Sequence, residues 1–444
     1  MLFKNYDQLI MNGQTPQFEQ KRKDALEMLT SAVEAVDPYL VIERVFHGKQ
    51  LTIKSVTIDL STFDHLYVVG FGKASIGMAQ AVCDAVPVTK GVVVTNDAKA
   101  TLTNRSVEVV VGGHPLPTEE SVRAAEKILQ LVQDCKEHDC VIVLISGGGS
   151  ALFEKPRVPL KDLQFMTDLL LRSGAEINEI NTIRKHLSEV KGGQLARSTN
   201  AKVISLVISD IVNDPISSIA SGPTSPDPTT FRDAKGILTK YELWEKTPET
   251  ILCVIDDGTH GRIPETLKGN NPVFKRVANF IVANNQLACD AAVKKAEELG
   301  YTGILLTTSM LGEAKEIGPY LIKKAMQSLS PEKTVFITGG ETTVTVQGNG
   351  KGGRNQQLVL SCLEELAGTE MVIASFATDG FDGNSPSAGA IADRFSSARA
   401  KKQKLNPVVF LREHNSSEFF TQLEDHLLTG PTGTNVMDIQ IFIK

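Results

Sequence analysis

The chain has 444 residues, of which 41% are apolar and 22% charged, and 46 Lys and Arg against 52 Asp and Glu give a net charge of −6 at pH 7. This balance argues against a nucleic-acid-binding protein, which needs a basic excess, and the length predicts two domains. No apolar run approaches the ~20 residues of a membrane span, and the six cysteines form neither a CxxC pair nor a zinc-like cluster. We therefore expect a soluble, cytoplasmic protein that binds neither nucleic acid nor membranes.

Short apolar runs of the kind that form buried strands recur along the chain. In chain order they are residues 66–69, 91–95, 107–111, 141–145, 203–208, 279–282, 303–306, 334–337 and 371–375. Most of them are continuous rather than alternating, which is typical of strands that helices cover on both faces.

Helical periodicity occurs between these runs, at residues 18–36, 121–133, 160–173, 229–241, 284–299, 312–327 and 354–366. The repeated strand-then-helix order predicts an α/β fold with largely parallel sheets. Because the stretch 256–271 is polar and weakly patterned, we place the domain boundary near residue 265. The expected domains are therefore residues 1–265 and 266–444.

A lysine follows the first strand, where residues 68–75 pass from an apolar run through two glycines and Lys73 into a helix. A lysine in the first helical turn meets the positive end of the helix dipole, and a bound anion would offset that cost. The stretch is not a GxGxxG motif, because Ser75 replaces the third glycine, and not a Walker loop, because Ala74 follows the lysine. A tight turn with a solvated lysine is the alternative.

Three consecutive glycines, Gly147, Gly148 and Gly149, followed by Ser150, end the apolar run 141–145. A glycine costs roughly 0.5–1 kcal/mol relative to alanine in regular structure. Three in a row therefore favour a backbone that passes close to a ligand, typically phosphate oxygens. A sharp turn, the alternative, needs only one glycine. We assign these four residues to nucleotide binding.

A second cation stands beside a second glycine run, because residues 350–353 lead directly into Arg354. The strand before this run ends in Gly340 and Glu341, which we also assign to nucleotide binding. Two cations beside glycine-rich backbone together indicate an enzyme that handles phosphate groups.

A basic group in a helical stretch, Arg184-Lys185-His186, offers further anion contacts. Adjacent helical residues point about 100° apart, so no more than two of them face one ligand. We assign Arg184 and Lys185 to substrate binding, and a solvated basic face is the alternative.

Two aspartates, Asp210 and Asp379, lie just beyond the strands 203–208 and 371–375. Carboxylates beyond strand ends are where α/β enzymes hold Mg²⁺ or a catalytic base, although Asp is also an ordinary turn residue. We assign both as Mg²⁺ ligands. His114 is open to two interpretations, a general base or a turn histidine.

Taken together, these segments resemble the type II glycerate kinases, whose C-terminal module is called MOFRL. The resemblance extends from about Gly70 to the C-terminus. The matching blocks are GFGKAS (70–75), GGHPLPTEES (112–121), LISGGGSALF (144–153), INTIRKHLSEVKGGQLA (180–196), ASGPTSPDPTTF (220–231), GGETTVTVQGNGKGGRNQ (339–356), ATDGFDG (377–383) and GPTGTN (430–435).

The resemblance implies ATP-dependent phosphorylation of D-glycerate, usually at the 2-hydroxyl, with Mg²⁺. It also implies a Rossmann-like N-terminal three-layer α/β domain, a C-terminal α/β domain and an active site in the interdomain cleft. Lys73 and Arg354 align with the family's catalytic lysine and arginine. Two departures are Asn213-Asp214-Pro215, where the family often carries one more acidic residue, and His414–Ser417, which lacks the family's Asn-Asp pair.

Other functions remain open at this point. One is an NAD(P)H-dependent hydroxypyruvate reductase, for which Asp97 is placed roughly where a ribose-binding acid is expected. Another is phosphorylation at the 3-hydroxyl, and a third is a ligand-binding protein without catalytic activity. The oligomeric state is also open, with a homodimer as one candidate.

Overall fold

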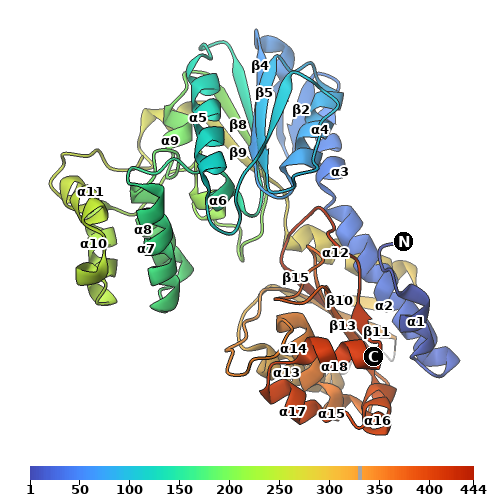
Figure 1. Ribbon diagram of the computed structural model, residues 1–444. Helices are drawn as coiled ribbons and strands as arrows, with labels where there is room; N and C mark the ends of the chain where they lie inside the picture. The colour runs from blue at the N-terminus through green and yellow to red at the C-terminus, as the bar shows by residue number, and fades with distance from the viewer. Residues whose placement is uncertain (329–332) are drawn as a thin grey trace. The chain divides into compact units, whose positions relative to one another are not determined.

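The computed structural model describes residues 1–328 and 333–444. The chain forms two compact units, which we call unit 1 (residues 1–37 and 283–444) and unit 2 (residues 38–282). In Figure 1 the blue N-terminal helices accordingly lie with the orange and red C-terminal segments in unit 1. Among the described residues, no helix has both the length and the apolar character needed to cross a bilayer.

Unit 2 is built on a six-stranded sheet whose order is that of a dinucleotide-binding fold. The order is β6 (Val107–Val111), β5 (Lys90–Thr95), β4 (Leu66–Phe71), β7 (Cys140–Ile145), β8 (Lys202–Ile208) and β9 (Val277–Ala283). The strands from β6 to β8 are parallel. Numbered along the chain this is 3-2-1-4-5-6, the order of Rossmann folds, so the predicted N-terminal architecture is confirmed.

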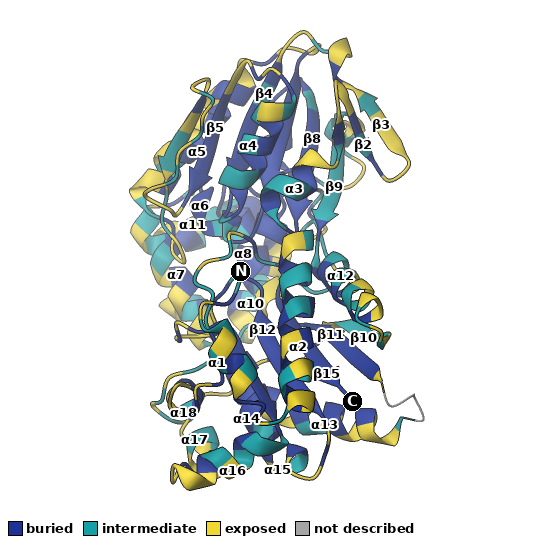
Figure 2. Ribbon diagram, turned by 90° about the vertical axis from the view of Figure 1, so that its right-hand side faces the viewer, coloured by how far each residue is buried: buried dark blue, intermediate teal, exposed yellow. Residues whose placement is uncertain are grey.

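Helices cover this sheet because its strands are apolar on both faces. Every residue of β7 is buried, and Figure 2 shows β4, β5 and β8 as buried strands. The core on one face joins Val69 and Phe71 to apolar residues of α5 (Glu119–Gln133). The flanking elements are α3 (Pro38–Glu43), α4 (Ser75–Ala85), α6 (Gly149–Leu152), α9 (Gln194–Arg197) and a small antiparallel sheet of β1 (Phe46–His47), β2 (Gln50–Ile53) and β3 (Val56–Asp59).

Four further helices of unit 2 form a separate cluster, visible beside the sheet in Figure 1. They are α7 (Leu160–Arg172), α8 (Ile177–His186), α10 (Phe231–Lys240) and α11 (Glu249–Thr259). Their apolar faces share a core of their own around Met166, Ile183, Phe231 and Ile251. The cluster carries the basic group of α8, so the packing of this core positions those side chains.

Unit 1 contains a second six-stranded sheet, which is mostly antiparallel. Its order is β10 (Thr302–Met310), β11 (Thr334–Gly340), β15 (Asp438–Ile443), β12 (Val372–Ala377), β13 (Gly389–Asp393) and β14 (His426–Leu427). Only β10 and β11 pair in parallel, so the expectation of largely parallel sheets is wrong for this unit. The reason is three strands that the sequence analysis did not predict, β13, β14 and β15. Strand β15 runs antiparallel to both of its neighbours, and β13 runs antiparallel to β12 and to β14.

Helices on both faces complete unit 1 as a three-layer structure. On one face, α2 (Pro16–Ala35) packs against α12 (Asn285–Glu298) and the strands β12 and β15. On the other, α13 (Ala314–Gln327) packs against α14 (Arg354–Ser361), which contacts β12 and β13. The remaining helices are α1 (Tyr6–Met11), α15 (Leu363–Leu366), α16 (Arg394–Lys402), α17 (Pro407–Arg412) and α18 (Ser416–Leu423).

All the apolar runs predicted as strands are strands in the structure, but the division of the chain differs from the expected one. The structure separates the units at residues 37/38 and 282/283 rather than near residue 265. One cause is β9, which continues the sheet of unit 2 past residue 265. The other is that residues 1–37 belong with the C-terminal segment.

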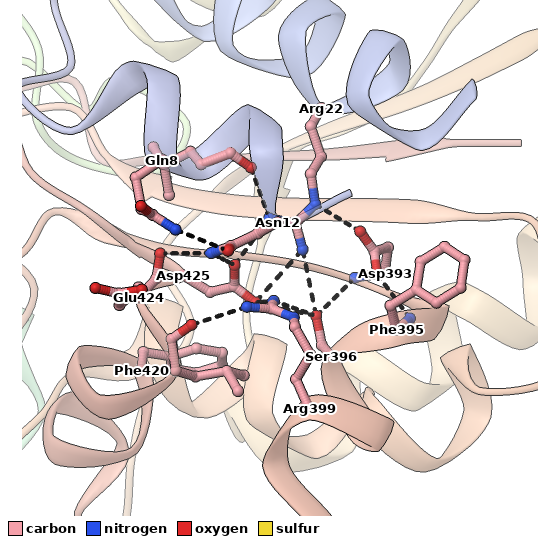
Figure 3. Close-up of polar contacts among 12 residues, drawn as sticks. Gln8, Asn12, Arg22, Asp393, Phe395, Ser396, Arg399, Phe420, Glu424 and Asp425 are labelled. Carbon is pink, nitrogen blue, oxygen red and sulfur yellow. Dashed lines mark hydrogen bonds and ion pairs between the residues drawn. The ribbon is translucent and has the colours of Figure 1, made fainter. Parts of the chain in front are cut away.

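A buried ionic network holds the N-terminal segment in unit 1 (Figure 3). The Nε of Arg22 on α2 lies 2.5 Å from Oδ2 of Asp393, and its Nη1 lies 2.8 Å from Oδ1 of Asp425. All three side chains are fully buried. Asn12 and Arg399 also donate to Asp425. Because a buried charge without a partner is strongly unfavourable, these contacts fix α2 on this unit.

Replacing Arg22 by alanine should leave Asp393 and Asp425 buried and underpaired. We expect Arg22→Ala to lower the unfolding free energy of unit 1 by about 3–5 kcal/mol, the usual effect of breaking a buried ion pair. Urea denaturation followed by circular dichroism measures it.

The neighbouring Lys23 provides the control for this substitution. Its side chain is 46% exposed and lies 3.9 Å from Glu27, so Lys23→Ala should change the unfolding free energy by less than about 1 kcal/mol. Equal, small effects of both variants would show that the buried network contributes little to stability.

Candidate active site

In unit 2 the candidate residues gather where the strand order reverses, between β4 and β7. In open α/β sheets this switch point, at the carboxyl ends of the strands, is where ligands bind. The N–H of Lys73, just beyond β4, donates to the carbonyl of Gly147, just beyond β7, at 2.8 Å. The N–H of Ala74 donates to Oγ of Ser146 at 3.1 Å. The two glycine-containing turns are therefore joined into one structure.

The glycine run is surrounded by the side chains of three candidate residues. A Cβ atom at Gly147 would lie 2.3 Å from Oδ2 of Asp210. At Gly148, where φ is +83°, a Cβ would lie 3.0 Å from Cδ2 of His114 and 3.5 Å from Cγ of Lys73. Glycine is needed here because functional side chains approach the backbone so closely. The run thus brings together Lys73, His114 and Asp210, which the sequence placed on three different loops.

The imidazole of His114 is neutral at physiological pH in this surrounding. Burial lowers its pKa below the ordinary value, and the nearby charge of Lys73 lowers the pKa further. A neutral imidazole accepts a proton or a hydrogen bond. Of the two interpretations of His114, the structure favours a site residue, since the ring lies beside Lys73 rather than in an isolated turn.

The loop after β8 combines polar contacts with an uncommon backbone conformation. Asn213, Asp214, Ala220 and Ser221 all have positive φ values, which are unfavourable for residues other than glycine and concentrate at functional sites. The hydroxyl groups of Ser221 and Ser150 lie 3.0 Å apart. The loop therefore contacts the glycine run directly.

The two basic residues predicted to bind substrate have different surroundings. Nζ of Lys185 lies 3.1 Å from Oδ1 of Asp227, and the two side chains are only 5% and 1% exposed. This buried ion pair gives Lys185 a role in the packing of the helical cluster. Arg184 is partly exposed, and burial lowers its pKa although the carboxylate of Glu154 opposes the shift. Arg184 thus remains the better candidate for a substrate contact.

In unit 1, Arg354 is held by carboxylates of its own unit. Its Nε and Nη2 contact the two oxygens of Asp438 at 2.5 and 3.0 Å, and its Nη1 lies 2.7 Å from Oε1 of Glu341. Asp438 is fully buried, whereas the side chain of Arg354 is 31% exposed. The guanidinium group is therefore oriented by a two-donor contact and still reaches the surface.

Carboxylates outnumber cations around Arg354. Burial raises the pKa of Asp438 and of Glu341, and Arg354 opposes both shifts. Asp379 is close enough to raise both values further. Burial also raises the pKa of Asp382 to about 7, although backbone N–H groups of α14 donate to it. Raised pKa values mean that the ionised form of these carboxyl groups is unfavourable, and a bound cation would stabilise it.

A Mg²⁺ ion fits this donor set only with ligands from outside the protein. Across residues 1–328 and 333–444, no three carboxylate, histidine or cysteine side chains are grouped so that they could hold a metal by themselves. Mg²⁺ in kinases is commonly held by one or two carboxylates together with phosphate oxygens and water. The predicted ligands Asp210 and Asp379 belong to different units.

The second glycine run, residues 350–353, does not leave all of its backbone N–H groups available to a ligand, contrary to the expectation from the sequence. The N–H groups of Gly350, Lys351 and Gly352 donate to the carbonyl of Glu413, to Asn415 and to Asn384. These glycines permit close packing against residues 413–417, so that segment supports the run that leads into Arg354. Gly340 is likewise needed for packing, since a Cβ there would lie 2.3 Å from the backbone of Met310.

Asp438, the buried carboxylate that contacts Arg354, was not predicted from the sequence, because it lies in the unpredicted strand β15. Asp382 follows the strand 371–375 in the same block as Asp379, so the sequence did offer it as a carboxylate beyond a strand end.

Comparison with known proteins identifies the family. Two family models match the chain, one described as a domain of unknown function (DUF4147) over residues 24–256 and one as the MOFRL family over residues 334–438. A glycerate 2-kinase from Pyrococcus horikoshii is 41% identical over 440 residues, covering 95% of this chain and 97% of that protein. The chain belongs to the glycerate kinase family.

Two further relatives of this glycerate kinase family member bear on its function. The crystal structure of a glycerate kinase from Thermotoga maritima matches with a TM-score of 0.84 and 36% identity, covering 96% of this chain and 99% of that one. A protein from Agrobacterium vitis that is provisionally named a hydroxypyruvate reductase is 39% identical over 391 residues, covering 85% of this chain and 86% of that protein. The α/β architecture predicted from the resemblance is therefore shared with a solved glycerate kinase.

The crowding at Gly148 in this family member can be measured with a matched pair of variants. Gly148 and Gly174 have similar positive φ values, +83° and +77°, but at Gly174, apart from its two chain neighbours, no residue that the structure describes has an atom within 4 Å of an added Cβ. Both alanine variants should lose roughly 1–2 kcal/mol from the left-handed backbone. Gly148→Ala should lose about 1–3 kcal/mol more, because the His114 ring must move. Urea denaturation measures the difference, and equal losses would contradict the proposed crowding.

Proposed function

We propose that this protein is a glycerate 2-kinase that transfers the terminal phosphoryl group of ATP to the 2-hydroxyl of D-glycerate, giving 2-phosphoglycerate and ADP. The observation that carries the proposal is the meeting of Lys73, His114 and Asp210 around the glycine run at the switch point. The names of the relatives support the same activity. A cytoplasmic location and a homodimeric state stay predictions.

Phosphoryl transfer depends on positioning and on neutralising charge, and Lys73 supplies a point charge for this purpose. Its ammonium group would stabilise the equatorial oxygens of the phosphoryl group as bonding to the leaving oxygen weakens. The 2-hydroxyl of glycerate must lose its proton when its oxygen bonds to phosphorus. The neutral imidazole of His114, beside Gly148, would accept that proton.

The carboxylate of glycerate needs a cation, and Arg184 is the candidate in unit 2. Arg184 is half-buried, whereas Lys185 is occupied by its buried ion pair with Asp227. Arginine binds carboxylates through two parallel donors, which would fix the orientation of the substrate. Orientation decides whether the 2-hydroxyl or the 3-hydroxyl meets the phosphoryl group.

ATP and Mg²⁺ are the phosphoryl donor and the metal in this proposal. The predicted Mg²⁺ ligands are Asp210 in unit 2 and Asp379 in unit 1, and either carboxylate would bind the metal with phosphate oxygens and water as the further ligands. The bound metal would neutralise phosphate charge. Arg354, oriented by Asp438, would contact the phosphate groups of the donor.

A hydroxypyruvate reductase is the second candidate, because one relative has that name. The turn after β4 lacks the third glycine of a dinucleotide motif. Asp97, the residue placed to bind a ribose, accepts a hydrogen bond from the N–H of Lys99 in a local turn. These observations favour the kinase.

Phosphorus NMR of the product tests the function directly. Purified protein incubated with ATP, Mg²⁺ and D-glycerate should give the resonance of a phosphate ester on a secondary carbon, whose coupling to one proton identifies 2-phosphoglycerate. A phosphorus resonance split into a triplet by two protons of a CH₂ group would instead identify the 3-phosphate. If the protein oxidises NADH with hydroxypyruvate and forms no phosphate ester, its activity is that of a reductase and the proposed kinase activity is wrong.

Removal of the Lys73 ammonium group should slow transfer far more than it affects folding. We expect Lys73→Ala to lower kcat by ~10²-fold or more, because charge stabilisation in the transition state is lost. The melting temperature should remain near that of the wild type, since a helix N-terminus does not favour a cation. Lys90→Ala, at an exposed position where β5 begins, is the control. If kcat of Lys73→Ala is within a few-fold of the wild-type value, Lys73 does not stabilise the transition state and the proposed role is wrong.

A further inference from the structure

A cavity of about 570 Å³ lies in unit 1 beside Arg354. Its walls come from the end of β10, the segment after β11, the glycine run and the first turns of α14. Pockets of about 300–1,000 Å³ commonly hold small molecules the size of a nucleoside or a drug. All the lining residues belong to unit 1, so this unit alone forms the cavity.

The lining combines apolar side chains with a few charged and polar groups. Leu311 and Val346 line it and are 61% and 68% exposed, unusually high values for large apolar residues. Val344 adds a third apolar side chain. Exposed apolar groups at the mouth of a pocket commonly mark a binding site for a flat or apolar ligand. Arg354 and Glu341 line the same cavity.

A buried hydroxyl in the wall lacks a partner. Thr342 lines the cavity and is 2% exposed, and its Oγ1 forms no hydrogen bond with any residue that the structure describes. A buried polar group left unpaired costs about 1–3 kcal/mol. Because the oxygen is itself buried, a ligand in the cavity would pair with it only after the Thr342 side chain turns toward the cavity.

We propose that this cavity is the nucleoside site of the enzyme, in which the base and ribose of a nucleoside triphosphate lie against Leu311, Val344 and Val346 and the phosphates extend toward Arg354. The inference rests on the proposed kinase activity, which requires such a donor. It goes further than that activity, because it assigns the binding of the donor's base and ribose to unit 1. A purine or pyrimidine has apolar faces and polar edges, which matches apolar walls with few polar groups.

The charges around the cavity determine whether a phosphate-bearing ligand needs a bound cation. The positive charge of Arg354 is balanced by Asp438 and Glu341, and Asp379 and Asp382 add further carboxyl groups. The carboxyl groups therefore repel a polyphosphate that has no bound cation. An uncharged nucleoside is not repelled in this way. Binding of a nucleoside diphosphate should depend on Mg²⁺, and binding of adenosine should not.

Single charge substitutions in the apolar wall test the site. We expect wild-type protein to bind ADP with Mg²⁺ in isothermal titration calorimetry, and Leu311→Asp and Val346→Asp to raise its Kd at least tenfold. Adenosine without metal should lose affinity in the same variants. Both side chains are largely exposed, so the variants should fold, as melting curves will show. Val408→Asp on α17, where the side chain is 71% exposed and outside the cavity, should leave the Kd within twofold.

Two outcomes overturn the proposal, namely no binding of ADP by the wild type, or an unchanged Kd for ADP in both cavity variants. Failure of the proposed activity gives a different result. If wild-type protein binds ADP in this cavity but transfers no phosphoryl group to glycerate, the nucleoside site is supported and the acceptor is wrong. If glycerate is phosphorylated with an unaltered KM for ATP in Val346→Asp and Leu311→Asp, the activity is supported and the nucleoside site is wrong.

Discussion

The buried pairing of Arg22 with Asp393 and Asp425 is the constraint on which unit 1 depends. It joins a helix at the start of the chain to elements near its end, and all three side chains are removed from water. Charges buried in this way stabilise only the arrangement in which they are paired, so they specify where α2 lies more strongly than apolar packing alone would. The sheet of unit 1 then has a covered face on each side, and β11, β12 and β15 can all be buried strands.

Glycine has two different functions in the two candidate regions. At Gly147 and Gly148 it lets the side chains of the candidate residues Asp210, His114 and Lys73 come close to the backbone of a switch point. In residues 350–353 it lets a loop pack closely on a supporting segment, and the loop's N–H groups are used in doing so. Glycine thus permits the close approach of candidate site residues in unit 2 and the close packing of the loop before Arg354 in unit 1. The sequence alone does not distinguish these two uses.

Most of the fold could be predicted from local pattern, because continuous apolar runs such as 141–145 form buried strands wherever they occur. The convergence of Lys73 and Asp210 was also accessible, since carboxyl ends of parallel strands meet at one edge. Two kinds of feature were not. The ion pair of Lys185 with Asp227 joins residues 42 positions apart, and periodicity carries no information about such partners. Strand β15 alternates polar and apolar residues at the end of the chain, so nothing in its pattern indicated a central position.

The order in which the chain leaves the ribosome has a consequence for unit 1. Unit 2 is one continuous segment, whereas Arg22 and its partner Asp393 are separated by 371 residues, and β15 lies between β11 and β12 although it follows both of them in the chain. Domains generally fold as units, N-terminal first, during synthesis. Unit 2 can therefore fold while the apolar face of α2 is still exposed, and unit 1 can close only after residues 438–443 of β15 have been made. Cellular factors that shield apolar helices would be needed most by the first residues of this protein.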